Sequence, residues 1–315
     1  MSYHILHIST PNCSLYTDKG LFFCEYDDGS TNKIAIADIK AIVVATYGVN
    51  FTNHCLAKLL ENDIVILHCN KSYQPTGWSL PLERTVRTRV FYNQIAQNKD
   101  FEIELWKKIL KQKVNNQAQN LDIIGCKEHN LYKLIERPLI SEANIAKQYW
   151  QKYFLQFNRD IKREHENAQE FENICLNYGY AIFNTLIYRS LIIHGMLASL
   201  GIHHEEKYKS TPLVYDLIEP YRAFVDYYLH NFFLHYPHEY KNKNLKAWSK
   251  YVAECLKNYR LKINDTSYKI LDIIDIYVEK IAESFINFDC KNIFLPELKK
   301  QYLYIDKQRN REYEE

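Results

Sequence analysis

The chain of 315 residues is 47% hydrophobic, which is enough for a sizeable core and argues against an intrinsically disordered protein. Its 40 Lys and Arg residues nearly balance its 38 Asp and Glu residues, giving a formal net charge of +2. Bulk charge therefore does not mark the chain as a nucleic-acid-binding protein, and any DNA contact must come from a local basic surface.

The first eighty residues have the patterns of β-strands. Residues 20–26 and 33–39 flank a turn around Gly29, which tolerates positive φ, so a hairpin is predicted there. The run 41–46 is apolar and rich in β-branched residues, as in a strand buried on both faces. A short helix is expected to begin near Thr52. Further strands are predicted at residues 4–8, 14–17 and 64–68.

The segment 72–81 gathers proline, glycine and serine and is expected to end the β-rich part of the chain. Beyond it the hydrophobic period changes from two to 3.6, and nearly everything from residue 82 to about residue 286 is expected to be amphipathic helix. The predicted fold class is therefore α+β. A small N-terminal β-sheet domain, residues 1–80, is expected to precede a larger all-α domain, residues 81–315, that carries the candidate site.

An acidic side chain begins the first helical segment of interest, residues 141–154. Glu142 is four residues before Ala146, which belongs to the apolar stripe, so Glu142 is expected to point along the buried side of the helix. An acid in the first turn, stabilised by the helix dipole by about 0.3–1 kcal/mol, is the simpler alternative.

Two adjacent histidines follow a long helical pattern that starts near Phe171. The pattern is expected to end at Gly201, because glycine is the usual residue just beyond a helix C-terminus, and His203 and His204 follow almost at once. Histidines near a helix C-terminus can also be favourable surface charges and nothing more, and this alternative stays open.

The segment 213–228 combines an apolar face with acidic residues. Asp216 and Glu219, three residues apart, are expected about 60° from each other around the helix, away from that face. Pro220 demands a kink or an early helix turn. Arg222 follows Glu219 by three residues, so an ordinary exposed salt bridge, worth under about 1 kcal/mol, is the alternative explanation for Glu219.

These acids and histidines could form a metal site if the helices bring Glu142, Glu219 and His204 together. Two carboxylates about 4 Å apart repel each other by about 4 kcal/mol at an effective dielectric near 20. A buried pair of this kind must gain a proton or a cation. Oxygen ligands with one imidazole suit Mg²⁺ or Mn²⁺ better than a thiolate-seeking metal. The patterns alone leave this convergence open.

Four motifs in this order resemble those of the CRISPR-associated integrase family, Cas-one. The family's "E-A-x-x-A-x-x-Y" helix start is matched by residues 142–149, and its "L-N-Y-G-Y-A" helix by residues 176–181. Its "G-x-x-H" is matched by residues 201–204, and its "L-x-x-D-L-x-E-x-x-R" by residues 213–222. The resemblance spans nearly the whole chain, and four ordered motifs at family spacing make it specific.

The resemblance implies that Glu142, His204 and Glu219 are catalytic residues that bind Mg²⁺ or Mn²⁺. His204 is preferred to His203 because it occupies the fourth position of the "G-x-x-H" motif. Many relatives have aspartate in place of Glu219, although a subset similar to this chain has glutamate. Asp216 matches a further family acid and is given a supporting role, with a helix-surface acid as the alternative.

The resemblance also implies the reaction and the partners. In this family the 3′-hydroxyl of a captured DNA fragment attacks a phosphodiester of a CRISPR repeat, so the expected partners include double-stranded DNA. Family members form homodimers that hold a dimer of a second small protein, Cas-two. Edge strands and tyrosines in residues 1–80 are expected to contribute dimer contacts.

Two groups of basic residues are candidates for DNA contact. Three arginines within six residues at the start of the helical region would make a compact phosphate-binding patch, and three lysines follow on a predicted helix. A solvated helix face is the alternative for both groups. The candidates are Arg84, Arg87, Arg89, Lys107, Lys108 and Lys111.

The compartment is expected to be the cytoplasm, with no membrane association. The eight cysteines are scattered without a C-x-x-C pair, as is typical of reduced thiols. The longest apolar stretch, residues 191–202, is interrupted by His194 and is too short to cross a bilayer.

Two other functions remain open at this stage. A metal-dependent nuclease that only cuts DNA would use the same ligands to activate water. A catalytically silent scaffold would instead use Glu142, Glu219 and Arg222 as a buried ionic network.

Overall fold

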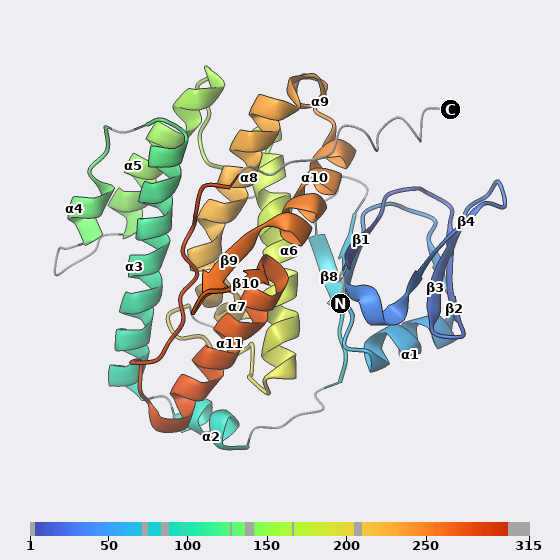
Figure 1. Cartoon of the computed structure of the whole chain (residues 1–315), viewed down its shortest axis with the longest axis horizontal. Helices are drawn as coiled ribbons and strands as arrows, with labels where there is room; N and C mark the ends of the chain where they lie inside the picture. Colours follow the sequence, from blue (N-terminus) through green and yellow to red (C-terminus); the bar gives the residue numbers. More distant parts are fainter. Residues whose placement is uncertain are drawn as a thin grey trace.

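The computed structural model describes residues 4–70, 75–82, 88–96, 98–126, 128–135, 142–165, 167–204 and 210–301. Strands occupy the first part of the described chain and helices occupy most of the remainder, so the predicted α+β fold class is confirmed. In Figure 1 the β-rich part lies on the right, and the helices from α3 (Lys99–Ile123) onward lie mainly on the left.

The first sheet lies against the helices and has the strand order β1-β5-β7-β8. Its strands are β1 (His4–Ile8), β5 (Ile39–Val44), β7 (Val65–Cys69) and β8 (Pro75–Ser79). The first three are parallel, and β8 pairs antiparallel with β7. All six residues of β5 are buried, as predicted for a strand covered on both faces.

This sheet separates two hydrophobic cores. Ala41, Val43 and Leu67 belong to the large core that the helices share, whereas Ile42 and Ile66 belong to a smaller core on the other face. The alternation follows from the strand geometry, because successive side chains point to opposite faces of a sheet.

The second sheet closes the smaller core and has the order β4-β3-β2-β6. Its strands are β2 (Ser14–Asp18), β3 (Leu21–Glu25), β4 (Thr31–Ala35) and β6 (Asn50–Phe51). The predicted hairpin joins β3 to β4, with Gly29 at φ 79°. The predicted short helix is α1 (Asn53–Glu61), which is capped where Thr52 Oγ1 accepts a hydrogen bond from the Cys55 amide at 3.1 Å.

The helical part is built around four long helices. α3 packs against α8, and α6 packs against both α8 and α11. The helices are α2 (Thr88–Ala96), α3, α4 (Leu131–Ile135), α5 (Glu142–Phe154), α6 (Phe171–Ile193), α7 (Pro212–Leu217), α8 (Arg222–His235), α9 (Pro237–Lys241), α10 (Leu245–Asn258) and α11 (Ile270–Asn287). Short 3₁₀ turns are η1 (Ile36–Asp38), η2 (Leu155–Phe157) and η4 (Glu219–Tyr221).

The segment expected to end the β-rich part of the chain contains β8, which pairs with β7. Two details of the predicted fold were wrong. A hairpin, β9 (Arg260–Ile263) and β10 (Thr266–Lys269), interrupts the region expected to be helical. α6 ends at Ile193 rather than at Gly201, because the chain turns at Gly195 with φ 67°.

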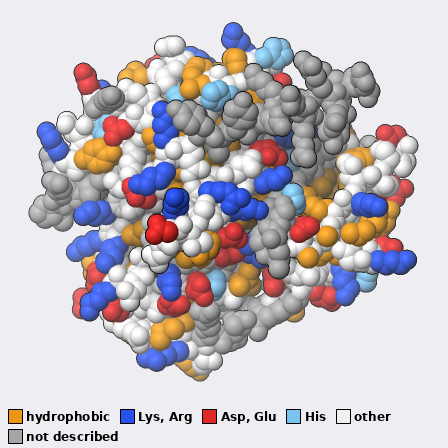
Figure 2. Space-filling view, viewed as in Figure 1, with side chains coloured by type: hydrophobic (Ala, Val, Ile, Leu, Met, Phe, Trp, Pro, Cys, Tyr) orange, Lys and Arg blue, Asp and Glu red, His pale blue; other side chains and the backbone are white. Residues whose placement is uncertain are grey.

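Acidic and basic side chains are intermingled on the surface of the face drawn in Figure 2, in keeping with the small net charge. Among the described residues, no helix combines the length and the apolar composition that crossing a membrane requires. The division into domains at residue 80 stays a prediction.

Candidate active site

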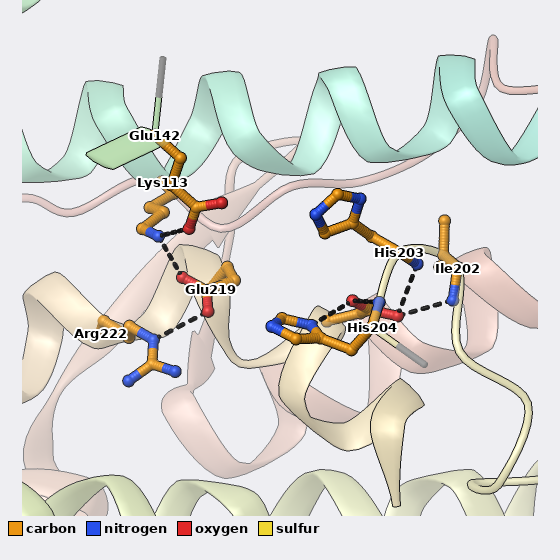
Figure 3. A network of polar contacts seen from close by, with 8 residues as sticks. Lys113, Glu142, Ile202, His203, His204, Glu219 and Arg222 are labelled. Atoms are coloured by element: carbon orange, nitrogen blue, oxygen red, sulfur yellow. Dashed lines mark hydrogen bonds and ion pairs between the residues drawn. The ribbon is translucent and has the colours of Figure 1, made fainter. Parts of the chain in front are cut away.

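Three elements bring an acid–lysine–acid cluster together. α5 supplies Glu142 from its first turn, η4 supplies Glu219, and α3 supplies Lys113 between them (Figure 3). The 3₁₀ turn is the kink that Pro220 was expected to produce, since proline cannot continue the backbone hydrogen bonding of α7. The kink directs Glu219 toward α3 at the junction of α7 and α8.

Asn116 fixes this kink to α3. Its Nδ2 donates to the carbonyl oxygen of Pro220 at 2.7 Å and to that of Pro296 at 2.9 Å. Its Oδ1 accepts from the Leu298 amide at 3.0 Å. Asn116 is completely buried, so it satisfies backbone groups that water cannot reach.

Lys113 contacts both carboxylates. Its Nζ is 2.5 Å from Glu142 Oε1 and 2.7 Å from Glu219 Oε2. The side chains of Lys113 and Glu219 are 9% and 4% exposed, whereas that of Glu142 is 39% exposed. One cation therefore bridges an acid at the surface and an acid in the interior.

Glu219 is held as a buried carboxylate by two cations. Arg222 Nε donates to its Oε1 at 3.0 Å, so the predicted salt bridge is present, but it is buried rather than exposed. Burial opposes ionisation of Glu219, yet Arg222 and Lys113 together lower its pKa to about 2. Oε2 is a buried oxygen whose partner is the Lys113 ammonium at 2.7 Å.

His204 is oriented by Asp216. The Nδ1 atom of His204 lies 2.7 Å from Asp216 Oδ1, and in Figure 3 the opposite edge of the ring faces the side on which Glu219 lies. The carboxylate also accepts three backbone amides, from Ile202 at 2.6 Å, His203 at 3.1 Å and His204 at 3.1 Å. Asp216 is fully buried, so the helix-surface alternative for it is wrong.

Gly201 allows this loop to close over Asp216. A Cβ atom at Gly201 would lie 2.2 Å from the carbonyl oxygen of His204 and 3.1 Å from Asp216 Oδ2. The first residue of the "G-x-x-H" motif is thus required for close packing and does not terminate a helix. His203 is exposed and stacks on Trp106 of α3, with ring centroids 4.3 Å apart and planes 6° apart.

The predicted ligands are only partly gathered. Glu142 and Glu219 meet at Lys113, and His204 lies beside them with Asp216. Within the part of the chain that the structure describes, no three His, Cys, Asp or Glu side chains form a group that could hold a metal ion. The role of the triad as a metal site stays a prediction.

The predicted DNA contacts also stay predictions. Arg89 is exposed on α2 and donates to Asn287 Oδ1 at 3.3 Å, while Arg84 and Arg87 lie outside the described residues. Lys107 and Lys111 are exposed on α3, roughly 120–160° around the helix from the lysine that faces the glutamates. Lys108 donates to the carbonyl oxygen of Cys290 at 3.0 Å.

Lys113 is the residue of this site that the sequence reasoning missed. A signal was present, because Lys113 falls on the apolar stripe of α3, four residues after Ile109 and four before Gln117. A lysine on a buried stripe needs an acidic partner from another element. Its partners are 29 and 106 residues away, so the pattern of α3 alone does not identify them.

Comparisons with known proteins identify the family and the fold of this chain. The model of the family described as "CRISPR associated protein Cas1" matches residues 6–236. The "CRISPR-associated endonuclease Cas1" of Neisseria meningitidis is 27% identical over 295 residues, which cover 88% of this chain and 91% of the relative.

Two solved structures share the fold. One described as "Casposase bound to integration product" has a TM-score of 0.79 at 17% identity and covers 99% of this chain and 98% of its own. One described as "Cas6-RT-Cas1--Cas2 complex" has a TM-score of 0.73 at 17% identity and covers 95% of this chain and 36% of its own. At these identities the likeness establishes the fold alone.

Proposed function

The chain belongs to the CRISPR-associated Cas1 family, a family of endonucleases and integrases, and from this premise we propose that it inserts DNA fragments into a CRISPR repeat array. In the proposed reaction the 3′-hydroxyl of the fragment attacks a phosphodiester of the repeat and releases the 3′-oxygen of the cut strand. Glu142, His204 and Glu219 would hold Mg²⁺ or Mn²⁺ at the reacting phosphate.

The acid–lysine–acid cluster carries this proposal. A single cation already bridges the oxygens of Glu142 and Glu219, so both carboxylates are within reach of one positive charge. Glu219 Oε2 is buried and its partner is the Lys113 ammonium at 2.7 Å, so this oxygen already receives a cation. Two carboxylates with an imidazole nearby are the oxygen-rich donor set that a hard divalent ion prefers.

His204 and Asp216 fit the same role. A histidine that binds a metal usually donates its second ring N–H to a carboxylate, and Asp216 is placed to accept from His204 Nδ1. That hydrogen bond leaves Nε2 with a free lone pair. Asp216 would thus be a positioning residue, which agrees with the supporting role expected of it.

A bound Mg²⁺ or Mn²⁺ would polarise the phosphoryl oxygen and stabilise the leaving 3′-oxygen. The chain's own residues keep the site ready for that chemistry. Arg222 holds one oxygen of Glu219, and Asn116 holds the carbonyl of Pro220 next to it, so the buried carboxylate has little freedom to turn away.

We further propose that the chain works as a homodimer with a small Cas-two-like dimer on double-stranded DNA. Support comes from the structural relatives, one in a Cas1–Cas2 assembly and one bound to an integration product. The sheet edges at β4 and β8 would contribute protein contacts, since edge strands carry unpaired backbone groups.

Strand joining tests the proposal. With Mn²⁺, a labelled fragment with a free 3′-hydroxyl and a supercoiled plasmid carrying the repeat, we expect Glu142→Ala and His204→Ala to lower joining by at least about 100-fold, the scale of lost transition-state stabilisation. DNA binding should stay nearly unchanged, whereas Glu142→Ala removes one partner of Lys113 and should lower the unfolding midpoint. Glu283→Gln on α11, an exposed acid, is the control. Joining at the normal rate by either variant would disprove the assigned site.

The alternatives predict different products. Nicking of the plasmid without joining would support a nuclease that only cuts. The scaffold alternative is favoured by one observation, namely that Lys113 and Arg222 already compensate the charge of Glu219. A scaffold would show no Mn²⁺ binding that depends on Glu142 in a calorimetric titration.

A further inference from the structure

Lys113 is a buried lysine whose ammonium group occupies the space between two carboxylates. Its side chain is 9% exposed, and Figure 3 shows it lying between Glu142 and Glu219. Lys113 lies on the buried side of α3, where its neighbours Ile109 and Val114 are fully buried. This position keeps its ammonium group between the two carboxylates. A buried ammonium needs this compensation by opposite charge.

The two oxygens of Glu219 have different partners. Oε1 accepts a hydrogen bond from Arg222 Nε at 3.0 Å, whereas Oε2 forms an ion pair with Lys113 Nζ at 2.7 Å. Arg222 is itself partly buried over the ring of Tyr180, with Cζ 5.0 Å from the ring centroid. Oε2 is therefore the oxygen of Glu219 that can change partner.

We infer that the Lys113 ammonium and a divalent ion are alternative occupants of the space between Glu142 and Glu219. The inference rests on the proposed function, which assigns Mg²⁺ or Mn²⁺ to these carboxylates. Both cations need Glu219 Oε2, because Arg222 takes Oε1. Two positive charges repel each other strongly at such a short distance, so ion binding must expel the lysine.

This exchange gives Lys113 two effects. It holds the two carboxylates together before the ion arrives, and it weakens the binding of the ion, because two ion pairs must first be broken. A purely structural ion pair would hold the carboxylates together without weakening the binding of the ion. The two roles are therefore separable by measuring ion affinity.

Calorimetric titration of the full chain with Mn²⁺ makes this measurement. In Lys113→Met the competing charge is gone, so we expect the Kd for Mn²⁺ to fall by at least about tenfold relative to the unchanged protein, a coupling of ordinary size between two mutually exclusive ligands. Lys147→Met, which removes an exposed charge from α5, should leave the Kd unchanged. Lys113→Arg keeps a cation in place and should bind Mn²⁺ no more tightly than the unchanged protein.

Thermal unfolding gives a second readout without catalysis. In EDTA, Lys113→Met should unfold at a lower temperature than the unchanged protein, because Glu219 loses one of its two cations. Saturating Mn²⁺ should raise the midpoint of the variant by more than it raises that of the unchanged protein, since the ion binds the variant more tightly. If Lys113→Met does not fold, Lys113→Gln, which keeps a donor, takes its place in both measurements.

The outcomes separate this inference from the proposed function. Equal Kd values for the unchanged protein and the Lys113 variant would overturn the exchange and leave the proposed metal site standing. Mn²⁺ binding in neither protein would overturn both. A variant that is destabilised in EDTA and not restored by Mn²⁺ would assign Lys113 a structural role alone.

Discussion

Glu219 and Asp226 are buried acids whose surroundings shift their pKa values in opposite directions. Burial by itself raises both pKa values. At Glu219 two adjacent cations outweigh burial, and the pKa falls to about 2. At Asp226 burial outweighs the hydrogen bonds from Tyr149 and Tyr180, and the pKa rises to about 6. Glu219 is thus ionised at neutral pH, as a metal ligand must be.

The raised pKa of Asp226 predicts a pH dependence of stability. Its unfolded pKa is about 3.9, so between about pH 4 and pH 6 Asp226 is protonated more often in the folded state than in the unfolded state. Its contribution to the unfolding free energy should therefore fall as the pH rises through this range, by about 3 kcal/mol for a two-unit difference. His7 and His230, whose pKa values burial lowers to about 4, contribute with the opposite sign, so the contribution of Asp226 is measured by urea unfolding of the unchanged protein and of Asp226→Asn from pH 4 to pH 7.

Asp226→Asn should remove this contribution, because the amide does not titrate. The unfolding free energy of the unchanged protein minus that of the variant should therefore fall by about 3 kcal/mol from pH 4 to pH 6. Glu219, whose depressed pKa removes stability as the pH falls below about 5, is present in both proteins and cancels in the difference. A difference that does not change with pH would show that Asp226 does not titrate in this range.

The crossing of α6 and α8 depends on one glycine of the "L-N-Y-G-Y-A" motif. A Cβ atom at Gly179 on α6 would lie 2.4 Å from Val225 Cγ1 on α8. Val225 is fully buried and has no free space to move into. The close approach of the two helices therefore requires glycine at residue 179. α8 begins directly after the turn that carries Glu219.

Gly179→Ala should lower the unfolding free energy by about 1–3 kcal/mol through overpacking, although alanine has the better helix propensity. Val225→Ala makes room for the added methyl group, so the double variant should be more stable than the sum of the two single changes predicts. Urea unfolding of all four proteins gives the coupling. Strict additivity would mean that the helices move apart instead.

Short sequence patterns predicted most of the strands and the start of α1. The period of two and the apolar run at residues 41–46 sufficed for most strands of the two sheets, and Thr52 sufficed for the start of α1. The β9–β10 hairpin was missed because amphipathic helices flank it. Its signal was the pair Asn264 and Asp265, which adopt φ 46° and 65° in a two-residue turn.

The site was less predictable, because burial of an acid depends on contacts between distant segments. Asp216 was placed on a polar helix face, whereas three backbone amides of the loop before the helix surround its carboxylate. Lys113 was not predicted as a site residue, because its partners come from α5 and η4. The motifs named the candidate residues, and the packing of α3 shows how two of them, Glu142 and Glu219, are held.

At the scale of the whole molecule, the β-rich part is attached to the helices by charge as well as by the shared core. Asp275 on α11 accepts from Lys40 on β5 at 2.6 Å and from Arg189 on α6 at 3.4 Å. Arg189 also donates to the carbonyl oxygen of Asp63, just before β7. Lys40 and Arg189 are 8% and 13% exposed at their side chains, so Asp275 is a shared partner of two nearly buried cations, and Asp272 lies 3.9 Å from Lys40 Nζ as well.

Asp275→Asn should therefore destabilise the protein by about 2–3 kcal/mol, somewhat less than the removal of a partner from a fully buried ion pair, because Asp275 is 28% exposed. Asp289→Asn, an exposed acid whose nearest lysine is 4.0 Å away, should change the unfolding free energy by less than about 0.5 kcal/mol. Adding Lys40→Met to Asp275→Asn should recover part of the loss, since it removes one of the two cations that lose this partner.

Urea unfolding followed by tryptophan fluorescence measures these differences. Trp78 on β8 donates to Thr185 on α6, so it reports on the contact between the sheet and the helices. Equal stability of the two single variants would show that the apolar core alone joins the sheet to the helices.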